Sequence, residues 1–103
     1  MNHPITTKDL QALIHGYSIE ITPKAAQKIG DFRPWLAAGT QVYVPHLRGS
    51  DIGDTLAACE QLQSQQMQAV PHIVLRNYRS EAELRQTLER VRALGIERVL
   101  RLA

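Results

Sequence analysis

One carboxylate, Glu20, interrupts a short apolar run from Tyr17 to Ile21 and is the side chain best placed to transfer a proton. Alternation along an extended strand puts Ile19 and Ile21 on one face and Glu20 on the other. On an isolated strand Glu20 would be an ordinary solvated residue. On the first strand of a parallel barrel it would lie near the carboxyl end, where such enzymes carry their catalytic groups.

Two histidines and an arginine accompany the next two apolar runs. His46 and Arg48 lie in the loop after the second run, and His72 lies within the third. Side chains of these types bind carboxylates, phosphates or a pterin ring. His46, His72 and Glu20 also form a donor set that suits zinc, but Pro45 fixes His46 for a loop role and no second residue orients the ligands. We therefore expect no metal site.

Cys59 is the only cysteine, which excludes an intrachain disulfide and a CxxC metal or redox site. It shares the apolar side of a predicted helix with Leu56 and Leu62, so we expect a buried, unreactive thiol. The first ten residues are polar, and no stretch has the length and hydropathy of a signal peptide or a membrane span. The default location is a reducing cytoplasm.

The composition describes one soluble globular domain. The chain has 103 residues, 44% of them hydrophobic, and a net charge of +2, which is too small to indicate nucleic acid or a membrane surface as a partner. Seven arginines lie between Arg76 and Arg101, interleaved with glutamates. This interleaving favours a salt-bridged helix face over a phosphate-binding patch.

Local signals divide the chain into alternating helices and strands. Thr7 caps a short helix over residues 8–15, and after the first strand a turn at 22–24 precedes two helical pieces within 25–38. The remaining predicted elements are a strand over 41–44, a helix from the cap Asp51 to about residue 66, a strand over 69–75, a helix from the cap Ser80 to residue 94 and a strand over 96–102.

The strand–helix unit repeats at a fixed interval, because Val42, Val70 and Arg98 are 28 residues apart. This spacing predicts an α/β fold of parallel βα units. A closed barrel of this kind usually needs about 250 residues and eight strands. Residues 1–103 supply one segment, an amino-terminal helix with four strands. We expect it to be the amino-terminal half of a TIM (β/α)8 barrel; a small open four-stranded sheet is the alternative.

Three motifs follow one another along the chain. They are Ser-Ile-Glu-Ile-Thr-Pro-Lys at 18–24, Ala-Val-Pro-His-Ile at 69–73 and Gly-Ile-Glu-Arg-Val-Leu-Arg-Leu-Ala at 95–103. In this order they resemble the amino-terminal part of methylenetetrahydrofolate reductase, a flavin-containing barrel enzyme. In that family the first strand carries one glutamate before Pro-Pro-Lys or Pro-Pro-Arg, the third reads Ala-Pro-His-Leu-Thr, and the fourth is completed by Gly-Asp or Arg-Gly-Asp.

The resemblance implies an oxidoreductase of one-carbon metabolism that reduces 5,10-methylenetetrahydrofolate to 5-methyltetrahydrofolate. Glu20 matches the family's general acid, which protonates a folate nitrogen so that the methylene bridge opens to an iminium. We expect a closed pocket that keeps this carboxyl group partly desolvated and protonated. His72 matches a histidine that lines the flavin site, Leu102 and Ala103 match the start of the fourth-strand flavin loop, and His46 would lie at the same end.

The cofactors that the resemblance implies are FAD and a hydride donor, NADH or NADPH. The implied partners are a folate substrate and the remaining half of the barrel or a partner chain, and we expect a homo-oligomer.

Two positions depart from the family's pattern. The second strand usually ends in Val-Thr-Tyr with the threonine on the flavin, whereas here Val44 precedes Pro45, which has no N–H to donate. Ala103 stands where many members have arginine. Both departures favour an alternative, a flavin-free, folate-linked one-carbon or demethylation protein. A third reading is a non-catalytic α/β half-barrel module that docks to a partner chain through its sheet edges.

Overall fold

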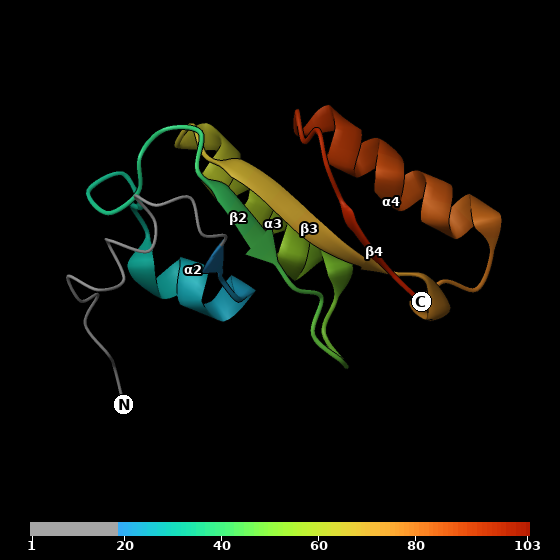
Figure 1. The fold of residues 1–103 in the computed structure, drawn as a ribbon. Coiled ribbons are helices and arrows are strands. Elements are labelled where there is room, and N and C mark those ends of the chain that lie inside the picture. Colours follow the sequence, from blue (N-terminus) through green and yellow to red (C-terminus); the bar gives the residue numbers. More distant parts are fainter. Residues whose placement is uncertain (1–18) are drawn as a thin grey trace.

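The computed structural model describes residues 19–103, in which strands and helices alternate (Figure 1). The elements are β1 (Ile19–Glu20), α2 (Pro23–Ile29), β2 (Gln41–Val44), α3 (Ile52–Ser64), β3 (Gln68–Val74), the 3₁₀ turn η1 (Leu75–Asn77), α4 (Glu81–Ala93) and β4 (Leu100–Leu102). The helix expected over residues 8–15 and the first two residues of the expected strand over 17–21 lie outside the described residues.

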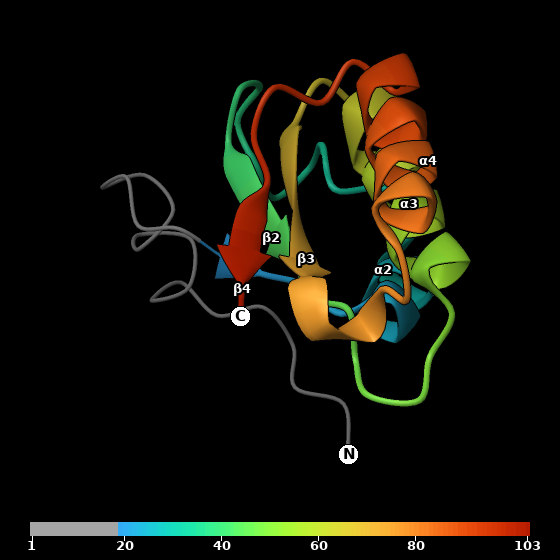
Figure 2. The ribbon, with the colours of Figure 1, turned by 90° about the vertical axis from the view of Figure 1, so that its right-hand side faces the viewer.

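The strands form one parallel sheet in the order β1-β2-β3-β4. A parallel neighbour requires a crossover, and the helices supply it. Figure 2 shows α2, α3 and α4 on the same side of the sheet. The predicted α/β class with alternating βα units is therefore confirmed for the part of the chain that the structure describes.

The hydrophobic core lies between the sheet and these helices. Val42 and Val44 contribute to it from β2, and Leu56, Cys59 and Leu62 contribute from α3. Alternation along β2 explains the strand residues, and the helical repeat explains the others. The prediction of a buried Cys59 is confirmed, because its side chain is fully buried and burial raises the pKa of the thiol to about 12.

The register refines the predicted repeat. Val42 lies opposite Ala69, and His72 lies opposite Leu100. The interval of 28 residues therefore holds between β3 and β4 but is one residue shorter between β2 and β3. Because one residue of register moves a side chain to the other face of a sheet, Val70 does not share the face of Val42.

The first described helix begins earlier than the sequence pattern predicts. The pattern indicates a turn at 22–24 and helical pieces within 25–38, but α2 already starts at Pro23. The hydroxyl oxygen of Thr22 accepts a hydrogen bond from the backbone N–H three residues later at 3.1 Å. Proline suits the first turn because its missing N–H would have no partner there. Gly30, with φ of +72°, ends the helix, and turns follow in place of a second helix.

α3 and α4 begin where their capping residues predict. The Asp51 carboxylate accepts a hydrogen bond from the Gly53 N–H at 3.0 Å, and the Ser80 hydroxyl accepts one from the Glu83 N–H at 3.1 Å. Caps are local interactions, so the sequence alone locates them. These two helices have 13 residues each. No helix among residues 19–103 is both long and apolar enough to cross a membrane.

α4 lacks the continuous salt-bridged face that the sequence indicates. Among residues 19–103, the one ion pair on this helix joins Arg85 to Glu81 at 2.9 Å, and both side chains are exposed. Such a pair contributes about 0.3–0.5 kcal/mol. Arg76 instead donates a hydrogen bond to the main-chain oxygen of Ala103 at 3.2 Å. At least one arginine of this group therefore lies at the carboxyl end of the sheet.

The last strand is shorter than the pattern predicts. β4 begins at Leu100, whereas the apolar run begins at Ile96. Ile96 is buried in the core between the end of α4 and the sheet. The apolar run from Ile96 to Leu102 thus has two parts. Its first residue is buried in the core, and its last three residues form an exposed edge strand.

Candidate functional site

Glu20 is the last residue of β1, at the carboxyl end of the strand as the sequence predicts. It lies in register with Tyr43, and Tyr43 lies in register with Val70. Successive residues of a strand point to opposite faces, and the neighbours of these three residues on their own strands belong to the core under the helices. The side chains of the three residues therefore share the face opposite the helices. His72 and its partner Leu100 lie on this face too. We call this surface, defined by these five residues, the helix-free face.

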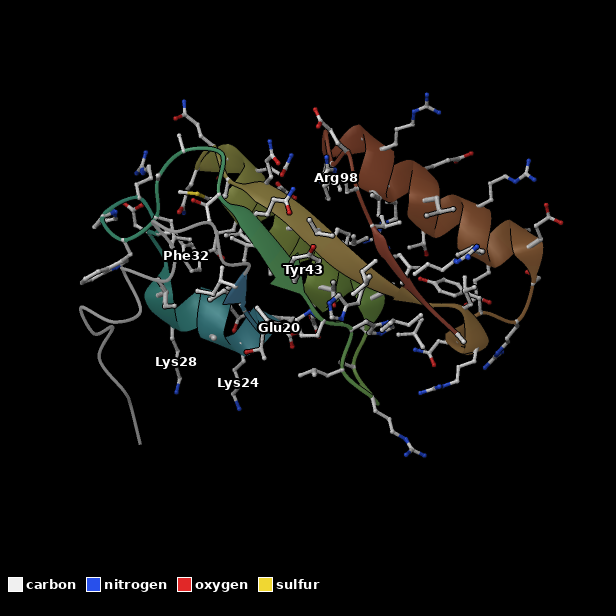
Figure 3. The ribbon with its side chains drawn as sticks, viewed as in Figure 1. Glu20, Lys24, Lys28, Phe32, Tyr43 and Arg98 are labelled. Atoms are coloured by element: carbon white, nitrogen blue, oxygen red, sulfur yellow. The ribbon has the colours of Figure 1, made fainter. Side chains whose placement is uncertain are left out.

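The Glu20 side chain is exposed, so residues 19–103 do not form the closed pocket expected around it. Lys24 and Lys28 extend from α2 away from the sheet, and Arg98 lies at the amino end of β4 (Figure 3). No described residue forms an ion pair with Glu20 within 4.0 Å. Among residues 19–103, its carboxylate therefore has no cationic partner.

His72 contacts Tyr43 on the same face. The two ring centroids are 6.2 Å apart and the rings meet edge to face, at an interplanar angle of 63°. His72 is half-buried, and its Nε2 atom is buried without a hydrogen-bond partner among the described residues. A histidine near the end of a strand ordinarily has its ring nitrogens hydrogen-bonded to the backbone. Nε2 of His72 has no such bond to a described residue. An unpaired buried polar atom of this kind costs about 1–3 kcal/mol, and a ligand or a water molecule could offset that cost.

Leu102 ends β4 in register with Val74, on the helix-free face. With Leu100 it presents apolar surface, since the two side chains are 39% and 38% exposed. Ala103 follows, and its main-chain oxygen is the acceptor for Arg76. Of the residues matched to the flavin site, the structure thus brings His72 and Leu102 onto one face.

His46 does not join His72 and Glu20. It lies in the loop after β2, with Nε2 at 2.9 Å from the Ser50 carbonyl oxygen. The loop is anchored to α3, because the buried Thr55 hydroxyl donates a hydrogen bond to the Pro45 carbonyl at 3.0 Å. Within residues 19–103, no three side chains form a group that could hold a metal ion, so the zinc set is not assembled.

Two residues of this region carry no signal of chemistry in the sequence. Tyr43 lies in register with Glu20 and its ring contacts His72, and Thr55 fixes the loop that carries His46. Tyr43 alternates with two apolar valines on its strand, which could have indicated that it points away from the core. Its position beside Glu20 also requires the register with β1. The contact of Thr55 depends on the path of the loop and has no local signature.

The helix-free face thus combines an exposed carboxylate, a phenol, an imidazole and apolar leucine surface. This combination suits proton transfer beside a flat, partly apolar ligand. No model of a known protein family matches the chain.

Proposed function

We propose that this chain is the amino-terminal half of a (β/α)8 barrel that reduces 5,10-methylenetetrahydrofolate to 5-methyltetrahydrofolate, as methylenetetrahydrofolate reductase does. The observation that carries the proposal is the position of Glu20, at the carboxyl end of β1 on the helix-free face. In a closed barrel this face becomes the interior, and catalytic groups gather at the carboxyl ends of the strands.

The topology supports a barrel over the other common parallel fold. The strands pair in chain order without a reversal, and the described helices cover one side only (Figure 2). A doubly wound sheet would reverse its strand order at a switch point and place helices on both faces. A barrel needs the observed arrangement, because its other face closes on itself.

Glu20 would act as the general acid. It gives its proton to the folate nitrogen that leaves the methylene carbon, that C–N bond breaks, and the remaining iminium accepts a hydride at the carbon. The carboxyl group is exposed on the half-barrel. Strands contributed by the other half would exclude water from it and keep the proton in place until the substrate arrives.

His72 and Leu102 fit a flat cofactor ring. Nε2 of His72 has no polar partner among residues 19–103, and Leu102 exposes apolar surface on the same face. When bound, FAD would pass the hydride from NADH or NADPH to the folate carbon. Glu20 would supply the proton independently of that transfer, from β1, which β2 separates from the strand of His72.

A second candidate function is a flavin-free, folate-linked one-carbon or demethylation reaction, and Pro45 favours it. Pro45 is buried at the end of β2 and has no N–H. Its carbonyl oxygen already accepts the hydrogen bond from Thr55. The backbone at this position therefore has no N–H that could donate to a flavin ring. Its carbonyl oxygen already accepts a hydrogen bond from within the chain.

The edges of the sheet support a partner for this chain. β1 and β4 each pair on one side only within the described sheet, and unpaired parallel edges bind further strands. We place the other half of the barrel at these edges, carried by further sequence or by a partner chain, in a homo-oligomer of the cytoplasm.

The test is a visible absorbance spectrum and a folate assay on the protein purified with its barrel complement. A flavin spectrum together with NAD(P)H-dependent formation of 5-methyltetrahydrofolate supports the reductase. Folate binding by a colourless protein supports the second candidate. A protein that neither binds nor converts the folate contradicts both, and leaves a non-catalytic module that docks to a partner chain.

A further inference from the structure

A cleft opens at the carboxyl edge of the sheet, between the loops that follow β2 and β3. Its volume is ≈ 650 Å³, within the range of about 300–1,000 Å³ that is typical of small-molecule sites. The first loop contributes His46, Arg48 and Ser50 to its lining, and the second contributes Arg76 and Asn77. We call it the loop cleft. Parallel sheets bind ligands outside the carboxyl ends of their strands, so the cleft has the position of a ligand site.

The described residues that line the loop cleft include two arginines and no carboxylate. Arg48 is exposed, and it forms no ion pair with a described residue. Arg76 uses one N–H for the Ala103 oxygen and keeps the other donors of its guanidinium. Two guanidinium groups from different loops repel each other unless an anion lies between them, and they suit the oxygens of phosphate or carboxylate.

His46 adds a polar atom that lacks a partner. A carbonyl oxygen only accepts, so the Nε2 atom that lies 2.9 Å from the Ser50 carbonyl must carry a proton. The other ring nitrogen, Nδ1, is buried without a hydrogen-bond partner among the described residues. In this tautomer Nδ1 is an acceptor, which a ligand hydroxyl or a water molecule could satisfy.

We infer that the loop cleft binds the phosphate or carboxylate groups of a small anionic ligand, held between Arg48 and Arg76 with His46 and Asn77 at the side. A second, smaller cavity of ≈ 90 Å³ lies at the amino end of the strands. It is lined by both Glu97 and Arg98, so its charges compensate each other and it has no preference for an anion.

This inference goes beyond the proposed reductase, because it requires neither flavin nor folate. It is tested by isothermal titration of the full chain, in the oligomeric form in which it purifies. The probes are inorganic pyrophosphate and glutarate, which carry the two chemistries. Arg48→Gln, Arg76→Gln and the matched control Arg90→Gln remove the same charge, and Arg90 is an exposed residue of α4 outside the cleft.

We expect saturable binding of one probe per chain, weakened about threefold to tenfold by Arg48→Gln or Arg76→Gln and unchanged by Arg90→Gln. Binding should weaken as salt is added, because the arginines are exposed. Arg48→Lys should lose less than Arg48→Gln, because a point charge remains. Addition of the probe should also shift the ring ¹⁵N signals of His46.

The two probes distinguish the source of the anion. Tighter binding of pyrophosphate assigns the loop cleft to a phosphate-bearing ligand, and tighter binding of glutarate assigns it to a carboxylate. The absence of saturable binding of either probe overturns the inference, and so does an equal loss in all three glutamine variants. If Arg76→Gln disturbs folding through its contact with Ala103, Arg48→Gln decides, since it loses no hydrogen bond within the described residues.

Discussion

Tyr43 and His72 meet edge to face on the side of the sheet that carries no helix, with their ring centroids 6.2 Å apart. The contact joins two neighbouring strands, and Tyr43 continues the row to Glu20. The proposed acid therefore lies in register with one member of this aromatic pair, on the same face of the sheet.

The contact itself should be measurable. In a double-mutant cycle of Tyr43→Leu and His72→Leu, we expect a coupling of about 0.5–1.5 kcal/mol in the free energy of unfolding. His72→Leu alone should change stability little or raise it, because it removes the orphaned Nε2 atom. Urea denaturation of the four proteins measures both. A coupling no larger than that of Tyr43→Leu with the distant, exposed Gln86→Ala would contradict the contact.

Glu20→Gln keeps the shape of the side chain but removes its ionisable proton. Folate turnover by the complete barrel should fall by about two to four orders of magnitude. Reduction of the cofactor by NAD(P)H should persist, because it needs no proton at the folate nitrogen. Separate measurement of the two half-reactions tests this, with the exposed Glu89→Gln as the control. Equal losses in both half-reactions would indicate a binding or folding role and would exclude Glu20 as the acid.

Gln65 ties the turn after α2 to α3. Its side-chain amide donates to the Gly30 carbonyl and accepts from the Phe32 N–H, each at 2.7 Å. Gln65→Ala should lower the free energy of unfolding by about 1–3 kcal/mol, because the Phe32 N–H loses its partner, whereas the Gly30 carbonyl keeps the hydrogen bond from Gln61 at 2.7 Å. Denaturant titration at fixed protein concentration measures the loss. Gln86→Ala, on the exposed side of α4, should stay within about 0.5 kcal/mol of the parent protein.

Cys59 should make stability depend on alkaline pH. An exposed cysteine ionises near pH 9, whereas burial raises the pKa of the folded thiol to about 12. Between these values the unfolded chain has lost the proton that the folded chain keeps, so stability falls as pH rises. The slope that this thiol contributes is up to about 1.4 kcal/mol per pH unit.

The difference between the parent protein and Cys59→Ala isolates this slope from those of the other groups that titrate at high pH. Below about pH 9 the thiol should contribute no slope. The native thiol should also resist labelling at neutral pH, because it is buried and protonated. Rapid labelling without denaturant would show that α3 does not hold Cys59 against the sheet.

Leu100 and Leu102 should promote association of the chain, because they expose apolar surface on an edge strand. Replacing both with lysine should shift sedimentation velocity profiles toward smaller species. Leu88→Lys serves as the control, since Leu88 is 39% exposed but lies on α4. A parent chain that is already monomeric, with one cooperative thermal transition, would contradict the half-barrel and favour a compact four-stranded domain.

The sequence by itself determined the elements whose signals are local. The strand Gln41–Val44 follows from alternating valines and the proline that ends it, and α3 and α4 begin at Asp51 and Ser80 because a cap bonds within its own turn. The burial of Cys59 follows from helical periodicity in the same way. At residues 22–24 the local pattern indicated a turn and was wrong, because the Thr22 hydroxyl accepts a hydrogen bond from the Ala25 N–H and caps α2.

Only the tertiary structure decided which distant side chains meet. The step of one residue in the register between β2 and β3 puts Val70 on the face of Tyr43, and no local pattern encodes a register. Arg76 belongs to a run of arginines along the chain, yet it lines the loop cleft with Arg48 because parallel strands bring their carboxyl ends together. Contacts of this kind depend on how separate helices and strands pack against one another. That packing cannot be read from the local pattern of a single sequence.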